Sequence, residues 1–225
     1  MSTPAILGGE RVRTRPFLPR KTMGEPEKHA ALEVLESDVL SAFLGSAGKF
    51  FLGGPRVRDF ESAWCERYGF RHCATVNSWT TGLMVALGAV GVEPGDEVIC
   101  PPYTMSASAT AAMFYGGIPV FADIEPDTLC LDPADFEAKI TPRTRAVVVV
   151  HLLGHPASMD PICEIAHRHG VAVIEDAAQA PGVFYRGRPV GAIGDVGGFS
   201  LNFHKHIHCG EGGVLVTNDD QIARA

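Results

Sequence analysis

Short apolar segments of β-forming residues alternate with segments of helical periodicity along most of this 225-residue chain. The clearest β segment is the run of four valines before His151, which has no polar face. A strand of this kind must be covered on both sides of its sheet, as parallel strands between two layers of helices are. The alternation therefore predicts an α/β domain that binds its ligands at the carboxyl ends of the strands. We expect strands at residues 72–76, 97–100, 119–122, 146–150, 172–174, 196–201 and 213–217.

Helical segments occupy the intervals between these strands. An amphipathic helix is expected over residues 25–43, where apolar residues recur near helical spacing, and a second helix is expected to begin at Pro55. Further helices are expected over residues 80–90, 106–114, 133–140 and 161–169, and from residue 219 onward. Residues 1–24 are rich in Pro, Arg and Gly and have no clear periodicity. We expect them to form an extended N-terminal arm and residues 25–225 to form one large domain.

Composition and charge argue against several classes of protein. The formal net charge is −7 at pH 7 and no basic stripe occurs, so nonspecific binding of nucleic acid is not expected. No apolar run is long enough to span a bilayer, and the first residues lack the apolar core of a signal peptide, which predicts a soluble cytoplasmic protein with no membrane partner. The six cysteines are widely spaced and form no CxxC. We therefore expect reduced thiols and no metal site.

Three polar residues between positions 171 and 218 have a distinctive spacing. Asp176 ends an apolar strand, and Ser200 stands five positions before Lys205, which precedes a glycine-rich segment. A buried carboxylate keeps a pyridine ring protonated, a lysine amine reacts with an aldehyde, and hydroxyl groups bind phosphate. Pyridoxal 5'-phosphate has a pyridine ring, an aldehyde and a phosphate. We predict that it is the cofactor.

The turn Ser78-Trp79-Thr80 is a second candidate for the cofactor phosphate. It follows the first expected strand and opens the next helix. Backbone N–H groups at the start of a helix have no intrahelical acceptor, and they bind anions readily. We expect this turn to bind the phosphate together with Ser200.

Several blocks of the sequence resemble the DegT/DnrJ/EryC1/StrS family of sugar aminotransferases. They are EDAAQ (175–179), GDVGGFS (194–200), the lysine at 205 and GEGG (210–213), and, earlier in the chain and also in family order, NSWTTGL (77–83) and PGDEVICPPYT (94–104). The resemblance covers roughly residues 25 to 225. It implies the large domain of the pyridoxal phosphate transferases of fold type I, a mixed, mostly parallel seven-stranded sheet between helices in three α/β/α layers.

The resemblance also implies individual roles. Lys205 matches the lysine that holds the cofactor as a Schiff base; histidine takes this position in related dehydratases, so lysine favours transamination. Gln179 matches a residue that hydrogen-bonds the ring oxygen of the cofactor or its surroundings. Where the family places an aromatic residue over the ring, this chain has Met105, whose sulfur can lie against a π face, and Tyr103 is near enough to replace it. Family members usually carry a small residue at Trp79, so its indole is a departure that contacts substrate or packs against the ring.

The function implied by the resemblance is transfer of an amino group, from glutamate as the expected donor, to the keto group of a nucleotide-linked sugar or a cyclitol. Family members are homodimers. Two alternatives stay open at this point, a pyridoxal phosphate-dependent sugar dehydratase and a catalytically silent fragment. The second arises because family members continue through a smaller C-terminal domain that these 225 residues do not contain.

Overall fold

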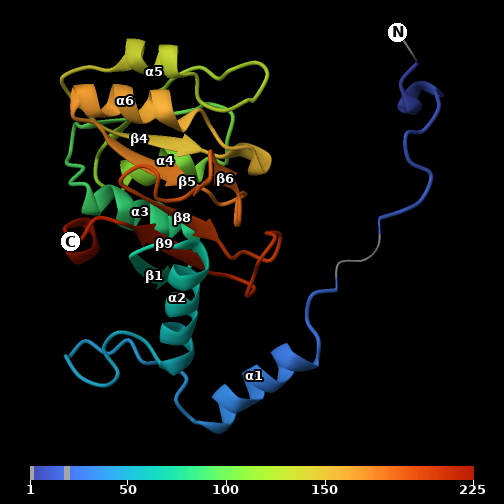
Figure 1. The fold of residues 1–225 in the computed structure, drawn as a ribbon, viewed down its shortest axis with the longest axis vertical. Coiled ribbons are helices and arrows are strands. Elements are labelled where there is room, and N and C mark those ends of the chain that lie inside the picture. Colours follow the sequence, from blue (N-terminus) through green and yellow to red (C-terminus); the bar gives the residue numbers. More distant parts are fainter. Residues whose placement is uncertain (1–2, 18–20) are drawn as a thin grey trace. The chain divides into compact units, whose positions relative to one another are not determined.

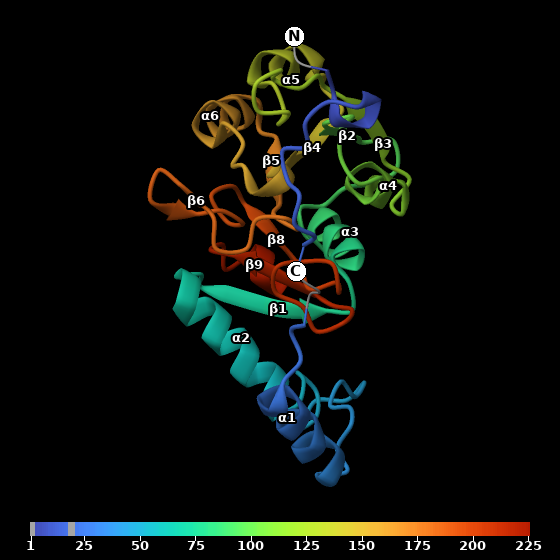
Figure 2. The ribbon, with the colours of Figure 1, turned by 90° about the vertical axis from the view of Figure 1, so that its right-hand side faces the viewer.

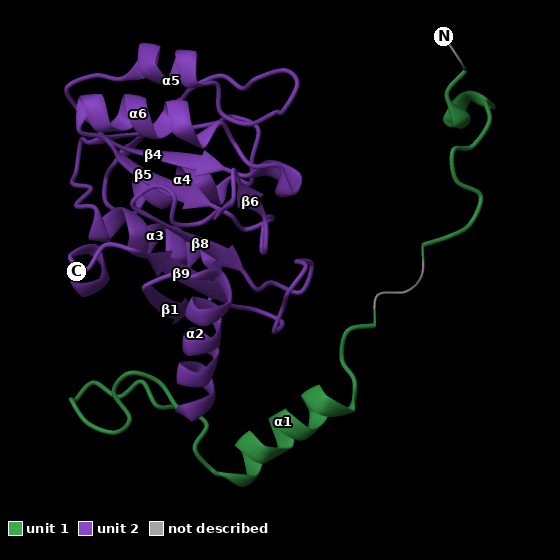
Figure 3. Cartoon of the chain, in the orientation of Figure 1, with its two compact units in different colours: residues 1–54 green, residues 55–225 purple. Residues whose placement is uncertain are grey.

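A computed structural model describes residues 3–17 and 21–225, which divide into two compact units, residues 1–54 and residues 55–225 (Figure 3). Residues 1–2 and 18–20 of the expected N-terminal arm lie outside the described residues, and the expected boundary between arm and domain stays a prediction. The smaller unit contains a short 3-10 helix, η1 (Ala5–Leu7), and the helix α1 (Glu25–Glu36). The Glu27 carboxylate accepts a hydrogen bond from the Gly24 N–H at the start of α1. The helix ends before residue 43, because Asp38 adopts a left-handed conformation with φ of 56°.

The larger unit is built on a seven-stranded sheet with the strand order β1-β9-β8-β5-β4-β2-β3 (Figure 1). Strand β9 is antiparallel to both of its neighbours, and the other adjacent pairs are parallel. The predicted mixed, mostly parallel sheet is therefore confirmed. The strands are β1 (His72–Val76), β2 (Glu97–Cys100), β3 (Ile118–Phe121), β4 (Thr144–Val150), β5 (Ala172–Asp176), β8 (Val196–Ser200) and β9 (Gly213–Thr217). A small hairpin of β6 (Phe184–Tyr185) and β7 (Arg188–Pro189), which the sequence did not suggest, lies outside this sheet.

Helices cover both faces of the sheet (Figure 2). Along β4, Val147 and Val149 pack in the same apolar cluster as residues of α5 and α6, whereas Ala146 and Val148 pack in a cluster with residues of α3 and α4. Successive side chains of a strand point to opposite faces, so an uninterrupted apolar run supplies both cores. The helices are α2 (Pro55–Tyr68), α3 (Trp79–Ala89), α4 (Ala107–Met113), α5 (Pro133–Lys139) and α6 (Met159–His169), with short 3-10 turns η2 (Leu152–Gly154) and η3 (Ile222–Arg224). Within residues 3–17 and 21–225, no helix has both the length and the apolarity that crossing a bilayer requires.

The strand directions bring the candidate residues to one edge of the sheet. Because β9 is antiparallel to both β1 and β8, these two strands run in the same direction as β5. Their carboxyl ends therefore share an edge, where Ser78 follows β1, Asp176 ends β5 and Ser200 ends β8. Ligands of open α/β sheets bind at this edge.

Glu175, the neighbour of Asp176, points into the core. Its carboxylate is fully buried and accepts hydrogen bonds from the backbone N–H groups of Gly191, Ile193 and Gly194, the segment that leads into β8. It is also bonded to Nε2 of the buried His151 at 2.9 Å. The Ala157 N–H donates to His151 Nδ1, so the proton of the imidazole is assigned to Nε2. This pair therefore has a structural role, because it fixes the segment that leads into β8.

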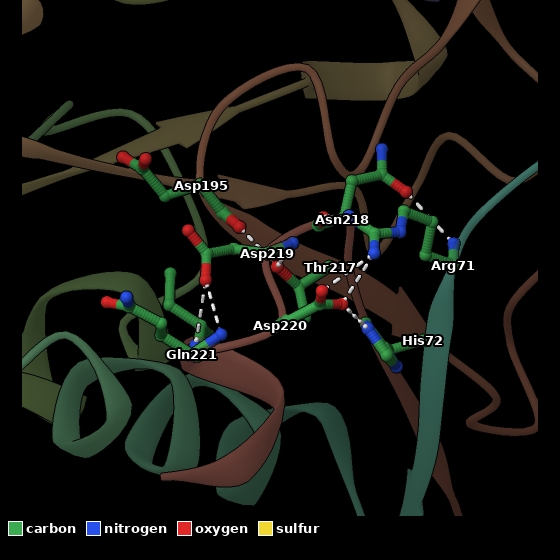
Figure 4. A network of polar contacts seen from close by, with 9 residues as sticks. Arg71, His72, Asp195, Thr217, Asn218, Asp219, Asp220 and Gln221 are labelled. Carbon is green, nitrogen blue, oxygen red and sulfur yellow. Dashed lines mark hydrogen bonds and ion pairs between the residues drawn. The ribbon is translucent and has the colours of Figure 1, made fainter.

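A polar network ties the segment after β9 to the start of β1 (Figure 4). The Asp220 carboxylate accepts from the Arg71 guanidinium and lies 2.7 Å from His72 Nε2. Asn218 Oδ1 accepts from the Arg71 backbone N–H at 2.9 Å. His72 and Arg71 lower the pKa of Asp220, with the hydrogen bond to His72 as the largest cause. The network therefore stabilises the pairing of β1 with the end of β9.

Candidate active site

A pocket of about 440 Å³ opens at the carboxyl edge of the sheet, a size typical of small-molecule sites. Its walls come from the starts of α3 and α4, the end of β5 and the loop after β8. The structure brings together eight of the nine residues predicted from the sequence: Ser78, Trp79, Thr80, Met105, Asp176, Gln179, Ser200 and Lys205. Tyr103 is not part of the lining, and its side chain is 56% exposed.

The Asp176 carboxylate is held in place by three donors. Its Oδ1 accepts from the Trp79 indole N–H at 2.7 Å and from the Ala178 N–H at 3.2 Å. The Ser108 hydroxyl donates to Oδ2 at 2.7 Å. Asp176 is only 4% exposed, so the three donors compensate for much of the hydration that a carboxylate loses on burial. The side chain of Asp176 is thus held in a fixed orientation at the pocket wall.

The first turn of α3 presents backbone donors beside this acid. Ser78 is the N-cap of the helix, and its Oγ accepts from the Thr81 N–H at 3.1 Å. The backbone N–H groups of Trp79 and Thr80 come before Thr81 in the chain. Like the first N–H groups of any α-helix, they have no acceptor within the helix. Such donors, together with the positive end of the helix dipole, are suited to bind an anion.

The loop after β8 carries the hydroxyl and the amine. Ser200, 7% exposed, ends the strand, and its Oγ accepts from the Asn202 N–H at 3.2 Å. The Lys205 N–H donates to the Asn202 carbonyl at 2.8 Å, which forms a turn that returns the lysine to the pocket. The Asn202 amide donates to the Glu211 carboxylate at 2.8 Å across the base of this loop. Side-chain bonds therefore hold the lysine loop at both ends.

Gln179 joins the pocket to the loop after β4. Its Oε1 accepts from the Leu153 N–H at 2.6 Å. Leu153 has φ of 53° and ψ of 21°, a left-handed conformation that is unfavourable for a leucine and that this bond helps to hold. Because the oxygen serves the loop, the amide N–H₂ of Gln179 is the part of the side chain suited to a ligand oxygen.

Sequence reasoning missed several residues of the site, of which Ser108, a partner of Asp176 behind the pocket lining, is the most informative. This serine is fully buried, and it also lies 3.0 Å from the Thr104 hydroxyl, which lines the same pocket. It is an ordinary hydroxyl in the first turn of α4, and no local signal relates it to an acid 68 residues away. Asn202, His204 and Glu211 also line the pocket, and proximity to Lys205 in the sequence was the only available indication.

The fold is that of the large domain of fold type I pyridoxal phosphate transferases, to which the similar solved aminotransferase structures belong. A model of the DegT/DnrJ/EryC1/StrS aminotransferase family matches residues 35–225. The chain belongs to this family, as the sequence blocks indicated.

Two curated relatives and one solved structure illustrate the similarity. The chain is 42% identical to the L-glutamine:2-deoxy-scyllo-inosose aminotransferase of Streptomyces fradiae over 100% of its own length and 52% of that protein. It is 43% identical to the GDP-perosamine synthase of Caulobacter vibrioides, with 92% and 54% covered. An aminotransferase structure from Psychrobacter cryohalolentis superposes with a TM-score of 0.85 at 36% identity and covers 93% of this chain and 51% of that one. The chain thus spans about half the length of the relatives it matches.

Proposed function

We propose that this chain is the cofactor-binding part of a pyridoxal phosphate-dependent aminotransferase that aminates a cyclitol or a keto sugar, which we expect to be nucleotide-linked.

 The observation that carries the proposal is the convergence of Asp176, Lys205 and the first turn of α3 on one pocket. The names of the relatives support a sugar or cyclitol as the amino acceptor.

The donor set of the pocket fits the cofactor. When bound, pyridoxal phosphate supplies an aldehyde that forms an imine with a lysine amine and a pyridinium ring that accepts electrons. Lys205 would provide that amine from the loop after β8 and, as a free amine, would move a proton during the amino transfer. Asp176 lies at the pocket wall to hold the ring nitrogen protonated. Ser200, Ser78 and the N–H groups of Trp79 and Thr80 bind the phosphate.

Two further assignments complete the proposal. Met105 lines the pocket and Tyr103 does not, which favours the methionine as the residue over the cofactor ring. Gln179 would donate its amide N–H₂ to the ring oxygen of the cofactor or to its surroundings. Both assignments concern residues that contact the cofactor, so each is tested by the affinity of the corresponding alanine variant for pyridoxal phosphate.

The proposal also includes the localisation, the oligomeric state and the amino donor of the enzyme. We expect a cytoplasmic homodimer, supported by the family resemblance and by exposed apolar side chains such as Leu153 and Phe203 in loops at the carboxyl edge of the sheet. Light scattering of the purified protein measures the oligomeric state. The amino donor expected from the sequence is glutamate, while a relative's name specifies glutamine, so both amino acids are assayed side by side.

The decisive experiment compares Lys205→Ala with Lys139→Ala, a surface lysine of α5. The wild-type protein and the Lys139 variant are expected to show the visible absorbance of a lysine–cofactor imine, and the Lys205 variant is expected to lack it. With a keto sugar, the wild type is expected to produce an amino sugar. Release of water without amino transfer would instead establish the dehydratase, and a wild type without the absorbance band would contradict the cofactor assignment.

A further inference from the structure

The indole of Trp79 occupies a position that neither of the interpretations based on the sequence anticipated. It is 5% exposed, and its N–H donates to Oδ1 of Asp176 at 2.7 Å across a separation of 97 residues. The indole therefore contacts the acid directly, and the bond is shielded from water, where a hydrogen bond to a charged group is strong.

The surrounding backbone is shaped to receive this ring. A Cβ atom added to Gly82 would overlap the six-membered ring of Trp79, and one added to Gly198 would overlap the same ring and the Val214 carbonyl oxygen. Glycine at these two positions provides the space that the indole fills. The indole is consequently fixed in one orientation, with its N–H directed at Asp176.

The donors to Asp176 are distributed unevenly between its two oxygens. Oδ1 accepts from Trp79 and from the Ala178 N–H, and Oδ2 accepts from Ser108. A carboxylate oxygen has two lone pairs, so Oδ1 is saturated and Oδ2 retains one acceptor position. The carboxylate is thus oriented with a single place for a further donor.

We propose that Trp79 is a positioning residue, whose indole N–H locks the Asp176 carboxylate so that the remaining lone pair of Oδ2 receives the protonated ring nitrogen of the cofactor. The inference rests on the proposed function, because it needs the pyridine ring to lie against Asp176. Trp79 acts through Asp176 and takes no part in the amino transfer itself. Without the indole N–H, Asp176 has fewer constraints on its rotamer and holds the ring nitrogen less well.

The chain offers a matched control for removing this single N–H. Trp64 on α2 is also 5% exposed, and its indole N–H has no hydrogen-bond partner among the described residues. Trp79→Phe and Trp64→Phe therefore make the same chemical change at two buried sites. Only the first removes a donor from Asp176.

Two measurements on the protein loaded with pyridoxal phosphate test the proposal. The dissociation constant of the cofactor is expected to rise about tenfold or more in Trp79→Phe and to stay near the wild-type value in Trp64→Phe. With cofactor labelled at the ring nitrogen, the ¹⁵N chemical shift is expected to move toward that of an unprotonated pyridine in Trp79→Phe alone. Equal values for the two variants would overturn the proposal.

A third measurement needs no change at Trp79 and holds even where Trp79→Phe does not fold. The protein has two tryptophans, so ¹⁵N-indole labelling gives two resonances, which Trp64→Phe assigns. Addition of pyridoxal phosphate is expected to shift the Trp79 resonance and to leave that of Trp64 in place. A Trp79 resonance that does not respond would refute the proposal, whereas a wild type that binds no cofactor would refute the proposed function instead.

Discussion

Replacing Glu175 by glutamine tests whether the buried carboxylate organises the sheet beneath the site. Four donors converge on it: Gly194 N–H at 2.7 Å and Ile193 N–H on Oε1, and Gly191 N–H at 2.7 Å and His151 Nε2 at 2.9 Å on Oε2. A glutamine has one oxygen and can keep two of these bonds. Its N–H₂ group then faces the other two donors.

The size of the effect follows from the two donors that lose their acceptor. Each unsatisfied buried donor costs about 1–3 kcal/mol, so the variant is expected to lose about 2–6 kcal/mol of unfolding free energy. A change of tautomer does not relieve His151, because a proton on Nδ1 would oppose the Ala157 N–H that donates to this atom. The loss is a large fraction of the 5–15 kcal/mol that typically stabilises a domain.

Urea unfolding followed by tryptophan fluorescence measures the change, with Glu164→Gln as the control. The Glu164 side chain is 75% exposed and pairs with Arg168 on the surface of α6, so its replacement is expected to cost no more than about 1 kcal/mol. If Glu175→Gln were as stable as this control, the four-donor account of the core would be wrong.

Three other predictions concern the rest of the larger unit. Asp220 has a lowered pKa in the folded protein, so its contribution to stability is present above the ordinary pKa of 3.8 and is lost as the pH falls through the lower folded pKa. The melting temperatures of the wild type and of Asp220→Asn should therefore differ at neutral pH and converge in acid. Burial raises the pKa of Cys100 to about 12, so iodoacetamide should modify the exposed Cys209 first and Cys100 only on unfolding, an order that mass spectrometry determines. Gly198→Ala should lower the unfolding free energy by about 1–3 kcal/mol or more, because the added Cβ would overlap the Val214 carbonyl oxygen. Gly45→Ala is the control, because Gly45 has open space around it and its replacement should not lower the unfolding free energy. A Gly198→Ala variant as stable as the wild type would contradict the close packing at the indole.

The predicted bounds agree with the structure for three of the strands. The strands at residues 72–76, 97–100 and 213–217 have the bounds that their apolar patterns predict. The helix expected over residues 25–43 ends at Glu36, because a left-handed residue at position 38 breaks a pattern that its apolar spacing suggested would continue. Local backbone geometry of this kind leaves only a weak trace in an amino-acid sequence.

In the candidate site, too, the sequence predicted some residues and only the structure revealed the roles of others. Asp176 and Glu175 are adjacent, and the two-residue period of a strand puts them on different sides, Asp176 toward the pocket and Glu175 toward the core. Lys205, Ser200 and the α3 turn follow from strand ends and from family blocks. The side chain of Trp79 and the hydroxyl of Ser108 do not, because their common partner, Asp176, is 97 and 68 residues away along the chain.

The order of apolar and polar residues was thus enough to predict the layered α/β fold and the edge of the sheet at which the candidate site lies. The orientation of the acid was decided only by tertiary structure. Hydrogen-bond direction depends on where distant elements bring their donors, and the space for the indole depends in part on Gly198 of β8, which is far from Trp79 along the chain. Neither quantity is local, so no window of the sequence contains it.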